Sequence, residues 1–260
     1  AKINHKLIPE SLNFKHIHLL TVDSTNRFAL ELISKTNPTD GFCVFSDVQT
    51  AGRGQYGREW LSESGKNLLA SFIFRTQFIQ LEDIFILHQL AGLSVLAALN
   101  SFGLTEAEIK WPNDIIIHDK KIAGILIQNT LRAHHLQYSI LGIGLNVNQV
   151  DFKELHTACS MRTEAHQEFD LKEILSVLHQ ELMGRFEDLK QGRFNHWLAA
   201  YNERLYRYGQ LCSFQRPDGE VFQAQIVAVN KKGELILEKE NAQLHYDFGS
   251  IKMVWPLKQP

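Results

Sequence analysis

Hydrophobic positions alternate or recur with helical spacing in clearly separated parts of the chain. In the first hundred residues, alternation predicts strands over residues 16–24, 42–50 and 68–75. Helical spacing predicts one helix after the polar cluster 23–26, whose residue types cap helices, and a second helix from Glu82 to Phe102. The chain therefore begins as a mixture of strands and helices.

The pattern becomes strand-like between residues 108 and 148. Short turns, one of them at Asp119-Lys120, separate apolar runs there, and such turns join antiparallel strands. Helical spacing returns over residues 170–190 and about 195–205. We expect an α/β fold of the α+β type, with a mainly antiparallel mixed sheet and flanking helices.

The C-terminal part has a different pattern. After Gly209, short strand-like runs alternate with turn signals, and no helical spacing remains. Such spacing is typical of a small β-barrel. We therefore predict a domain boundary near residue 208, with a large domain over residues 1–208 and a small one over residues 209–260.

Composition narrows the possible functions. The 27 basic and 29 acidic residues give a formal net charge of −2, which excludes a generally polybasic nucleic-acid binder. Cys43, Cys159 and Cys212 are far apart and lack zinc-site spacing, so we expect a reducing compartment, the cytoplasm. The first 14 residues lack the apolar run of a signal peptide. Polar residues interrupt the apolar run 84–99, which predicts a buried helix and no membrane span.

A loop rich in glycine and arginine, residues 52–57, has the spacing G-x-G-x-x-G. A loop-like segment and then a strand follow it instead of a helix, so we reject a dinucleotide-binding fingerprint. Its glycines allow the backbone to approach an anion, and Arg53 and Arg58 supply charge. A flexible surface hairpin is the alternative interpretation. Residues 64–67 lack the leading glycine of a phosphate-binding P-loop.

Polar residues also interrupt the apolar strands of the middle region. Residues 110–114, Lys-Trp-Pro-Asn-Asp, predict either a bend that brings polar side chains to a cleft or a capped strand end. Lys121 opens the next strand, and simple alternation places it with Ala123 and Ile125 on one face and Gly124 on the other. For Lys121, a solvated lysine beside a turn is the alternative.

Two further glycines, Gly142 and Gly144, alternate with apolar residues inside a strand. Small residues on one face leave either a flat slot for a ligand or room for close packing against a helix. The histidines show no metal-site spacing, and no nucleophile motif of a covalent hydrolase occurs.

The order of these segments resembles that of the biotin–protein ligases. The segments that carry the resemblance are Ser24–Asn26, Gln49–Gly54, Arg58–Trp60, Lys110–Asp114, Lys121–Leu126 and Gly142–Asn146. It extends from about Leu19 to Trp255, and implies a catalytic α/β domain followed by an SH3-like barrel. It also implies synthesis of biotinyl-5′-AMP from biotin and ATP, with Mg²⁺ expected, and transfer of biotin to one lysine of a biotin carboxyl carrier domain.

The resemblance assigns roles to individual residues. Those implied to bind biotin are Ser24, Thr25, Asn26, Gln49, Gly52, Arg53, Gly54, Gln55, Lys121, Gly124, Gly142 and Gly144. Those implied to bind ATP or the adenylate are Arg53, Arg58, Trp60, Lys110, Asn113, Lys121 and Asn146. The residues implied to be catalytic are Lys121, between carboxylate and α-phosphate, Asp114, near the incoming lysine, and Arg53.

Two departures from the family pattern affect what is expected. Gln55 stands where some members carry another arginine, which puts the distribution of charge on the adenylate in doubt. Only 23 residues precede Ser24, too few for the DNA-binding domain of bifunctional members, so we expect a monofunctional enzyme that binds no DNA. The sequence leaves homodimer formation open. A lipoate–protein ligase and a non-enzymatic biotin or nucleotide sensor are the alternative functions.

Overall fold

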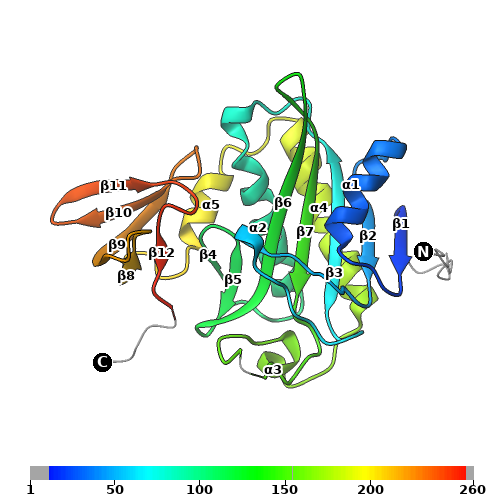
Figure 1. The fold of residues 1–260 in the computed structure, drawn as a ribbon, viewed down its shortest axis with the longest axis horizontal. Helices are drawn as coiled ribbons and strands as arrows, with labels where there is room; N and C mark the ends of the chain where they lie inside the picture. Colours follow the sequence, from blue (N-terminus) through cyan, green and yellow to red (C-terminus); the bar gives the residue numbers. More distant parts are fainter. Residues whose placement is uncertain (1–11, 154, 256–260) are drawn as a thin grey trace.

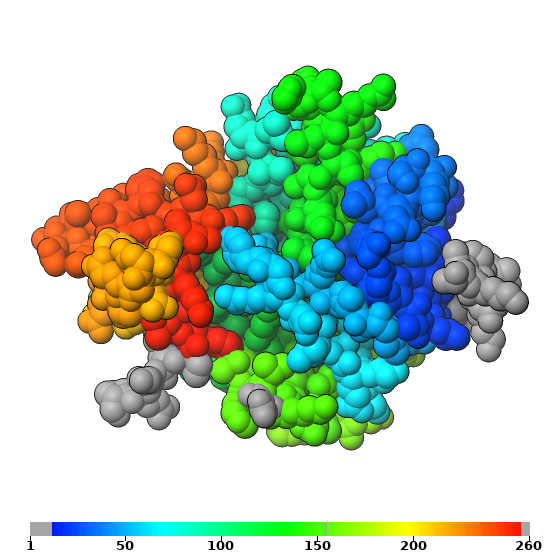
Figure 2. All heavy atoms as spheres, in the orientation of Figure 1, coloured from blue at the N-terminus to red at the C-terminus, as the bar shows by residue number. Residues whose placement is uncertain are grey.

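The computed structural model describes residues 12–153 and 155–255. A seven-stranded sheet forms the main part, and a five-stranded antiparallel sheet lies to one side of it (Figures 1 and 2). The strands of the large sheet, in spatial order, are β1 (His16–Leu19), β2 (Phe42–Ser46), β3 (Leu68–Arg75), β7 (His135–Leu145), β6 (Lys120–Arg132), β5 (Asp114–Ile117) and β4 (Glu108–Lys110). Only β1 and β2 pair in parallel, so the predicted mainly antiparallel mixed sheet is confirmed.

Helices cover both faces of this sheet. The α-helices of the described residues are α1 (Thr25–Lys35), α2 (Ile86–Ser101), α3 (Met161–Ala165), α4 (Leu171–Lys190) and α5 (Trp197–Glu203). Helix α1 lies on one face and joins the parallel pair β1 and β2, whereas α2 and α4 lie on the other face (Figure 1). The sequence did not predict α3, a single short helix that begins with a capping box between Ser160 and Thr163.

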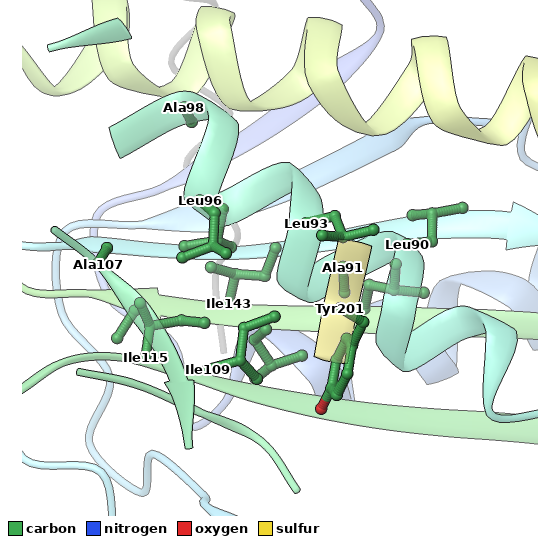
Figure 3. Packing of buried hydrophobic residues seen from close by; sticks show 14 of the residues in the cluster. Leu90, Ala91, Leu93, Leu96, Ala98, Ala107, Ile109, Ile115, Ile143 and Tyr201 are labelled. Carbon is green, nitrogen blue, oxygen red and sulfur yellow. The ribbon is translucent and has the colours of Figure 1, made fainter. Parts of the chain in front are cut away.

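The core occupies both sides of the large sheet, because side chains along each strand alternate between its faces. On β3, Phe72 and Phe74 belong to the cluster around α2, whereas Ile73 belongs to a smaller cluster under α1. Helix α2 is apolar around its circumference because the sheet, α4 and α5 all contact it. Figure 3 shows leucines of α2 and isoleucines of the sheet in this core: Leu90, Leu93, Leu96, Ile109, Ile115 and Ile143.

The predicted all-β C-terminal unit is confirmed. Its strands are β8 (Leu211–Gln215), β9 (Val221–Val229), β10 (Leu235–Lys239), β11 (Ala242–Tyr246) and β12 (Lys252–Met253). The order is β11-β10-β9-β8-β12, so β11 and β12 are the two edges in the part of the chain that the structure describes.

Aromatic contacts join this second sheet to the main part. The ring of Phe248 packs edge-on against Phe85 and His88, with centroid separations of 6.1 and 5.1 Å. Trp111 Nε1 donates a hydrogen bond to the carbonyl of Gly233 at 2.9 Å. Buried residues of both sheets belong to one hydrophobic cluster, and the division near residue 208 remains a prediction.

The apolar segment around α2 is buried, as the sequence predicts. Residues Leu81–Ser101 have the length and mean hydropathy, 1.6, of a membrane-spanning helix, but 72% of that apolar window is buried inside the structure. Burial of this kind is typical of a core helix. The sequence analysis expects no signal peptide in the first 14 residues, and most of these positions lie outside the described residues.

Acid should destabilise the fold through His88. Burial lowers the pKa of His88 to about 4, and its Nδ1 has no hydrogen-bond partner within the described residues. In the unfolded chain, His88 binds a proton below about pH 6.5. The stability that neutral His88 contributes is therefore present above about pH 6.5 and is lost as the pH falls towards 4, by up to about 3 kcal/mol.

Urea titrations of His88→Phe and the wild type, at about pH 7.5 and 4.5, measure this effect. The variant cannot take up the proton, so its free energy of unfolding should fall less between the two pH values. His196→Phe is the control, because His196 is exposed before α5. A wild type and a His88→Phe variant with the same pH dependence would contradict the expectation.

Candidate functional site

A cavity of about 390 Å³ lies beside the N-terminus of α1, on the face of the large sheet that α1 partly covers. Sequence-predicted residues line it, namely Ser24, Thr25, Asn26, Gln49, Arg53, Gly54, Gln55, Arg58, Trp60, Lys110, Asn113, Asp114, Lys121, Gly124, Gly142 and Gly144. Gly52 and Asn146 are the two predicted site residues that do not line it. The fold therefore brings together segments that are far apart in the sequence.

A chain of polar contacts fixes the end of the cavity next to α1. Gln49 Oε1 accepts hydrogen bonds from the backbone amide and the hydroxyl of Thr25, at 2.8 and 3.1 Å. Asn26 Nδ2 donates to the carbonyl of Leu126 at 3.2 Å. Gln49 Nε2 and the Ser24 hydroxyl have no protein partner within the described residues, so both can serve a ligand.

Sequence reasoning missed Ser71, which holds this end together. Ser71 is fully buried on β3, and its hydroxyl lies 2.6 Å from Asn26 Oδ1 and 2.8 Å from Thr25 Oγ1. The available signal was a lone hydroxyl inside the apolar run 68–75, because a buried polar side chain requires a partner.

Glycines make the floor of the cavity flat. Gly124 on β6 pairs with Gly144 on β7, and the indole of Trp60 lies directly over both. A Cβ atom at these glycines would come within 2.8 and 2.6 Å of the Trp60 ring. A Cβ at Gly142 would come within 2.2 Å of Asn26 Oδ1. The structure shows close packing against a helix at Gly142, where Asn26 of α1 lies, and a ligand slot beside these glycines remains a prediction.

The prediction that Lys121 and Gly124 point to opposite faces is wrong. The register between β5 and β6 shifts between Ile115 and Ile116, so that Ile122 is an extra, bulged residue. The bulge reverses the alternation, and a Cβ at Gly124 would lie 3.2 Å from Lys121 Nζ. Lys121 therefore points into the cavity beside Gly124, while Ala123 remains in the core.

An ion triad occupies the middle of the cavity. Lys121 Nζ lies 2.6 Å from Asp114 Oδ1, and Lys110 Nζ lies 3.8 Å from Asp114 Oδ2. The three side chains are 28%, 17% and 16% exposed in the order Lys121, Asp114, Lys110. Lys121 Nζ is also 5.2 Å from the ring centre of Trp60, and Lys110 Nζ is 5.3 Å from that of Trp255.

The charges of the cavity favour an anionic ligand. Its basic side chains are Arg53, Arg58, Lys110, Lys121 and Lys252, and its acidic side chains are Glu59 and Asp114. Burial lowers the pKa of Lys110, and the neighbouring cations lower it further, against the opposing effect of Asp114. The cavity is therefore electropositive although the whole chain has a net charge of −2.

The glycine–arginine loop is a small hairpin at the mouth of the cavity. The amide of Gly54 donates to the carbonyl of Arg58 at 2.7 Å, and the amide of Trp60 donates to that of Gly52 at 2.9 Å. A Cβ at Gly52 would lie 2.6 Å from the Trp60 carbonyl, so Gly52 serves to close the hairpin. At the tip, Tyr56 adopts a positive φ of 57°.

Asn146 lies beneath the site and supports its backbone. Its side-chain amide donates to the carbonyl of Cys159 at 2.9 Å and lies 3.5 Å from that of Lys121. Asn146 is buried, and its own backbone amide donates to the carbonyl of Ile122. These contacts hold the bulged start of β6, so the structure gives Asn146 a supporting position.

The C-terminal sheet also contributes to the cavity, which residue spacing did not predict. Gly249, Ile251 and Lys252 line its far end, and Tyr56 of the hairpin packs against Gly249. These residues lie almost 200 positions from the hairpin in the sequence. Only the folded chain brings them together.

The chain is similar in sequence and in fold to known ligases. Residues 19–146 match the model of the biotin/lipoate A/B protein ligase family. The bifunctional ligase/repressor BirA of Escherichia coli strain K12 is 30% identical, over 96% of this chain and 78% of the relative. A biotin–[acetyl-CoA-carboxylase] ligase of Mycobacterium tuberculosis is 29% identical, over 83% of this chain and 80% of the relative.

A solved structure, the biotin protein ligase from Aquifex aeolicus in complex with biotin and ATP, superposes with a TM-score of 0.76. It is 26% identical, and the match covers 92% of this chain and 98% of that one. The chain belongs to the biotin/lipoate A/B protein ligase family. Within that family it is a biotin–protein ligase.

Gly142→Ala should disturb the site, because the new methyl group collides with the Asn26 amide that reaches Leu126 and Ser71. Crowding of this kind costs about 1–3 kcal/mol of unfolding free energy. We expect that loss in urea titrations, together with weaker ligand binding.

Gly184→Ala is the matched control, because nothing lies within 4 Å of a Cβ at this position in α4. Alanine is the better helix former, so this variant should be more stable by about 0.5–1 kcal/mol. Equal stability of the Gly142→Ala variant and the wild type, with unchanged ligand affinity, would contradict the assigned contact.

Proposed function

We propose that this cavity joins the carboxylate of biotin to the α-phosphate of ATP and then transfers the biotinyl group to a lysine of a biotin carboxyl carrier domain. The single observation that carries the proposal is the position of Lys121. Its ammonium group lies between a flat, glycine-floored slot and a cluster of cations, and Asp114 holds it there. The named relatives and the Aquifex complex with biotin and ATP support the same chemistry.

In the first step, a carboxylate oxygen of biotin forms a bond to the α-phosphorus, and the bond from that phosphorus to the β-phosphate oxygen breaks. Pyrophosphate leaves with the electron pair, and biotinyl-5′-AMP remains. Two anions must approach each other, so positive charge at the reacting atoms lowers the barrier. We assign this role to Lys121, and we expect Arg53 and Arg58 on the hairpin to add charge from the mouth of the cavity.

The biotin end is assigned to the polar network beside α1. Ser24, Asn26 and Gln49 present hydroxyl and amide groups that match the donors and acceptors of a ureido ring. The glycine floor and Trp60 provide the flat, apolar walls that a ring system requires. The nucleotide is assigned to the other end of the cavity, with Lys110, Asn113, Arg58 and also Trp60.

In the second step, the amine of the acceptor lysine attacks the carbonyl carbon of the adenylate, and AMP leaves. The amine must first lose a proton. Asp114 is the carboxylate nearest Lys121, so we assign it to accept that proton and orient the amine. The hairpin excludes water from the hydrolysable anhydride.

Mg²⁺ is expected with the triphosphate. Within the described residues, no cluster of three or more His, Cys, Asp or Glu side chains could hold a metal ion. In the cavity, Asp114 is already paired with two lysines. These residues do not form a protein-built metal site, and we assign no step to the ion.

The family relationship supports a proposal for the acceptor. We infer a carrier domain of a carboxylase as acceptor, because relatives are named biotin–[acetyl-CoA-carboxylase] ligases. We also predict that the protein binds no DNA and that it is located in the cytoplasm. Formation of a homodimer is compatible with the proposal.

The choice of acid can be tested directly, because the family model includes lipoate ligases as well as biotin ligases. Incubation with each acid, ATP and the matching carrier domain separates the two. A non-enzymatic sensor would bind biotin or nucleotide without biotin-dependent exchange of pyrophosphate into ATP.

Lys121→Ala should block adenylate formation. Loss of one preorganised charge of this kind lowers the rate by roughly 10²–10³-fold. Lys121→Arg should also be poor, because the larger planar group cannot replace a compact ammonium between two anions. The measurement is biotin-dependent exchange of pyrophosphate into ATP at saturating substrates.

Lys120→Ala is the control for Lys121→Ala, since Lys120 is exposed and does not line the cavity. Circular dichroism must confirm folding, because the Lys121→Ala variant leaves Asp114 with Lys110 alone. Exchange above about a third of the wild-type rate, a difference of under about 1 kcal/mol, would remove Lys121 from the centre of the mechanism.

Lys110 should take up a proton when ATP binds at alkaline pH. Burial lowers its pKa in the free protein, and a bound anion favours the charged form and raises that pKa again. At a pH between the pKa of Lys110 in the free protein and its pKa in the complex, and below about pH 10.4, binding of ATP should therefore absorb protons.

Calorimetry in two buffers with different ionisation enthalpies counts these protons. Lys110→Met should abolish the uptake, and Lys120→Met should retain it. The assignment fails if the Lys110→Met variant absorbs as many protons as the wild type.

A further inference from the structure

The ammonium group of Lys110 is held less firmly by Asp114 than that of Lys121. The separation between nitrogen and carboxylate oxygen is 2.6 Å for Lys121 but 3.8 Å for Lys110, and the longer separation exceeds the length of a hydrogen bond. A lysine side chain is a flexible stem that ends in a point charge. Asp114 alone therefore leaves the position of the Lys110 ammonium poorly defined.

The indole of Trp255 provides a second contact for Lys110. Lys110 Nζ lies 5.3 Å from the centre of this ring, within the range of a cation–π interaction. Trp255 is half-buried and does not line the cavity, so it contacts the lysine without being part of the wall that faces a ligand. It follows β12, which Figure 1 shows in red between the C-terminal sheet and the β4 edge of the large sheet.

Tyr206 connects this indole to the backbone of β4. Trp255 Nε1 donates a hydrogen bond to the hydroxyl oxygen of Tyr206 at 3.2 Å. Tyr206 is only 3% exposed, and its backbone amide donates to the carbonyl of Ile109 at 2.9 Å. Since Ile109 directly precedes Lys110, the same tyrosine is fixed to the strand that carries the lysine and to the ring beside its ammonium group.

Asp119 sets the direction of these hydrogen bonds. Its Oδ1 accepts from the Tyr206 hydroxyl at 2.5 Å and from the Arg207 guanidinium at 2.7 Å. The bond from Tyr206 is the largest cause of a lowered pKa for Asp119, so this side chain remains a carboxylate at neutral pH. The single hydroxyl proton therefore goes to Asp119, and the oxygen is free to accept from the indole, which can only donate.

The series of contacts runs from one cavity lysine to the other. Asp119 lies in the turn between β5 and β6, two residues before Lys121, and Trp255 lies beside Lys110. Neither Asp119, Tyr206 nor Trp255 lines the cavity. For packing alone, phenylalanine would serve as well at position 206, whereas the hydroxyl group of Tyr206 orients the indole.

We propose that Tyr206 is a positioning residue for the first step: its hydroxyl orients the indole of Trp255, which holds the Lys110 ammonium in place for the nucleotide. The inference rests on the proposed function and deepens it, because it concerns two residues outside the wall of the cavity. Order imposed before binding reduces the conformational freedom that the Lys110 side chain loses when ATP arrives.

Biotin-dependent exchange of pyrophosphate into ATP, with the concentration of ATP varied, tests the inference. Tyr206→Phe should raise the KM for ATP by about three- to fivefold, as expected for loss of one buried hydrogen bond. Trp255→Phe loses the same bond and should give a similar rise, and the double variant should be no worse than either single variant. Trp255→Leu also loses the aromatic face, so we expect a rise of about tenfold.

Two controls separate positioning from a general loss of structure. Tyr208→Phe is the matched variant, because Tyr208 is exposed and lies outside the cavity, and its KM for ATP should equal that of the wild type. In a Lys110→Met background, Trp255→Leu should add less than about a twofold change, since no ammonium group remains to be held. The KM for biotin should be unchanged in the Tyr206 and Trp255 variants, because biotin is assigned to the other end of the cavity.

Failure of the inference and failure of the proposed function give different results. In a wild type that exchanges pyrophosphate, a Tyr206→Phe variant whose KM for ATP is within about 1.5-fold overturns the inference alone. Equal KM values for Trp255→Phe and Trp255→Leu also overturn it, as does a parallel rise in the KM for biotin, which indicates a structural role. A wild type without biotin-dependent exchange overturns both proposals.

Discussion

One carboxylate, that of Asp114, allows two ammonium groups to share a partly buried site. Without it, Lys110 and Lys121 would face each other where water screens them poorly, and repulsion would cost on the order of a few kcal/mol. The local structure provides this arrangement, because Lys110 ends β4 and pairs directly with Asp114 at the start of β5. Residues directly opposite each other in an antiparallel pair project to the same face, so the two side chains lie on the same side.

The same charges are available to a substrate only because the chain directs them into one space. The bulge at Ile122 reverses the direction of Lys121, and the glycine pair Gly124 and Gly144 clears the floor beside it. Bulges next to active sites often redirect a side chain in this way. Binding and catalysis therefore depend on backbone irregularities as much as on the identity of the charged residues.

Much of this structure could be predicted from the sequence, and the failures have physical causes. Strand β3 and helix α4 agree closely with the predicted segments, because period-two and helical spacing are local signals. The face of Lys121 was predicted wrongly, since a bulge changes register without a distinctive residue type.

Long-range contacts account for the other differences. Lys252 lies far along the chain from the hairpin, and no spacing rule connects the two. The resemblance implied a nucleotide contact for Asn146, which remains a prediction; the contacts that its side chain makes with the backbone of β6 and of the segment before α3 could not be read from the sequence. Ser71 was visible as a polar residue in an apolar strand, but only its partners reveal what it does.

The shared core of the two sheets limits the routes by which large molecules reach the cavity. Phe85, Trp111 and Phe248 pack across the junction, so separating the sheets would expose large aromatic surfaces to water. Rotation of the C-terminal sheet away from α2 is therefore a costly way to open the site. The hairpin 52–60 is mostly exposed, and among its side chains Trp60 packs over the glycine pair and Tyr56 packs against Gly249. Movement of this hairpin would expose less aromatic surface than separation of the two sheets, so a large acceptor would reach the cavity past the hairpin.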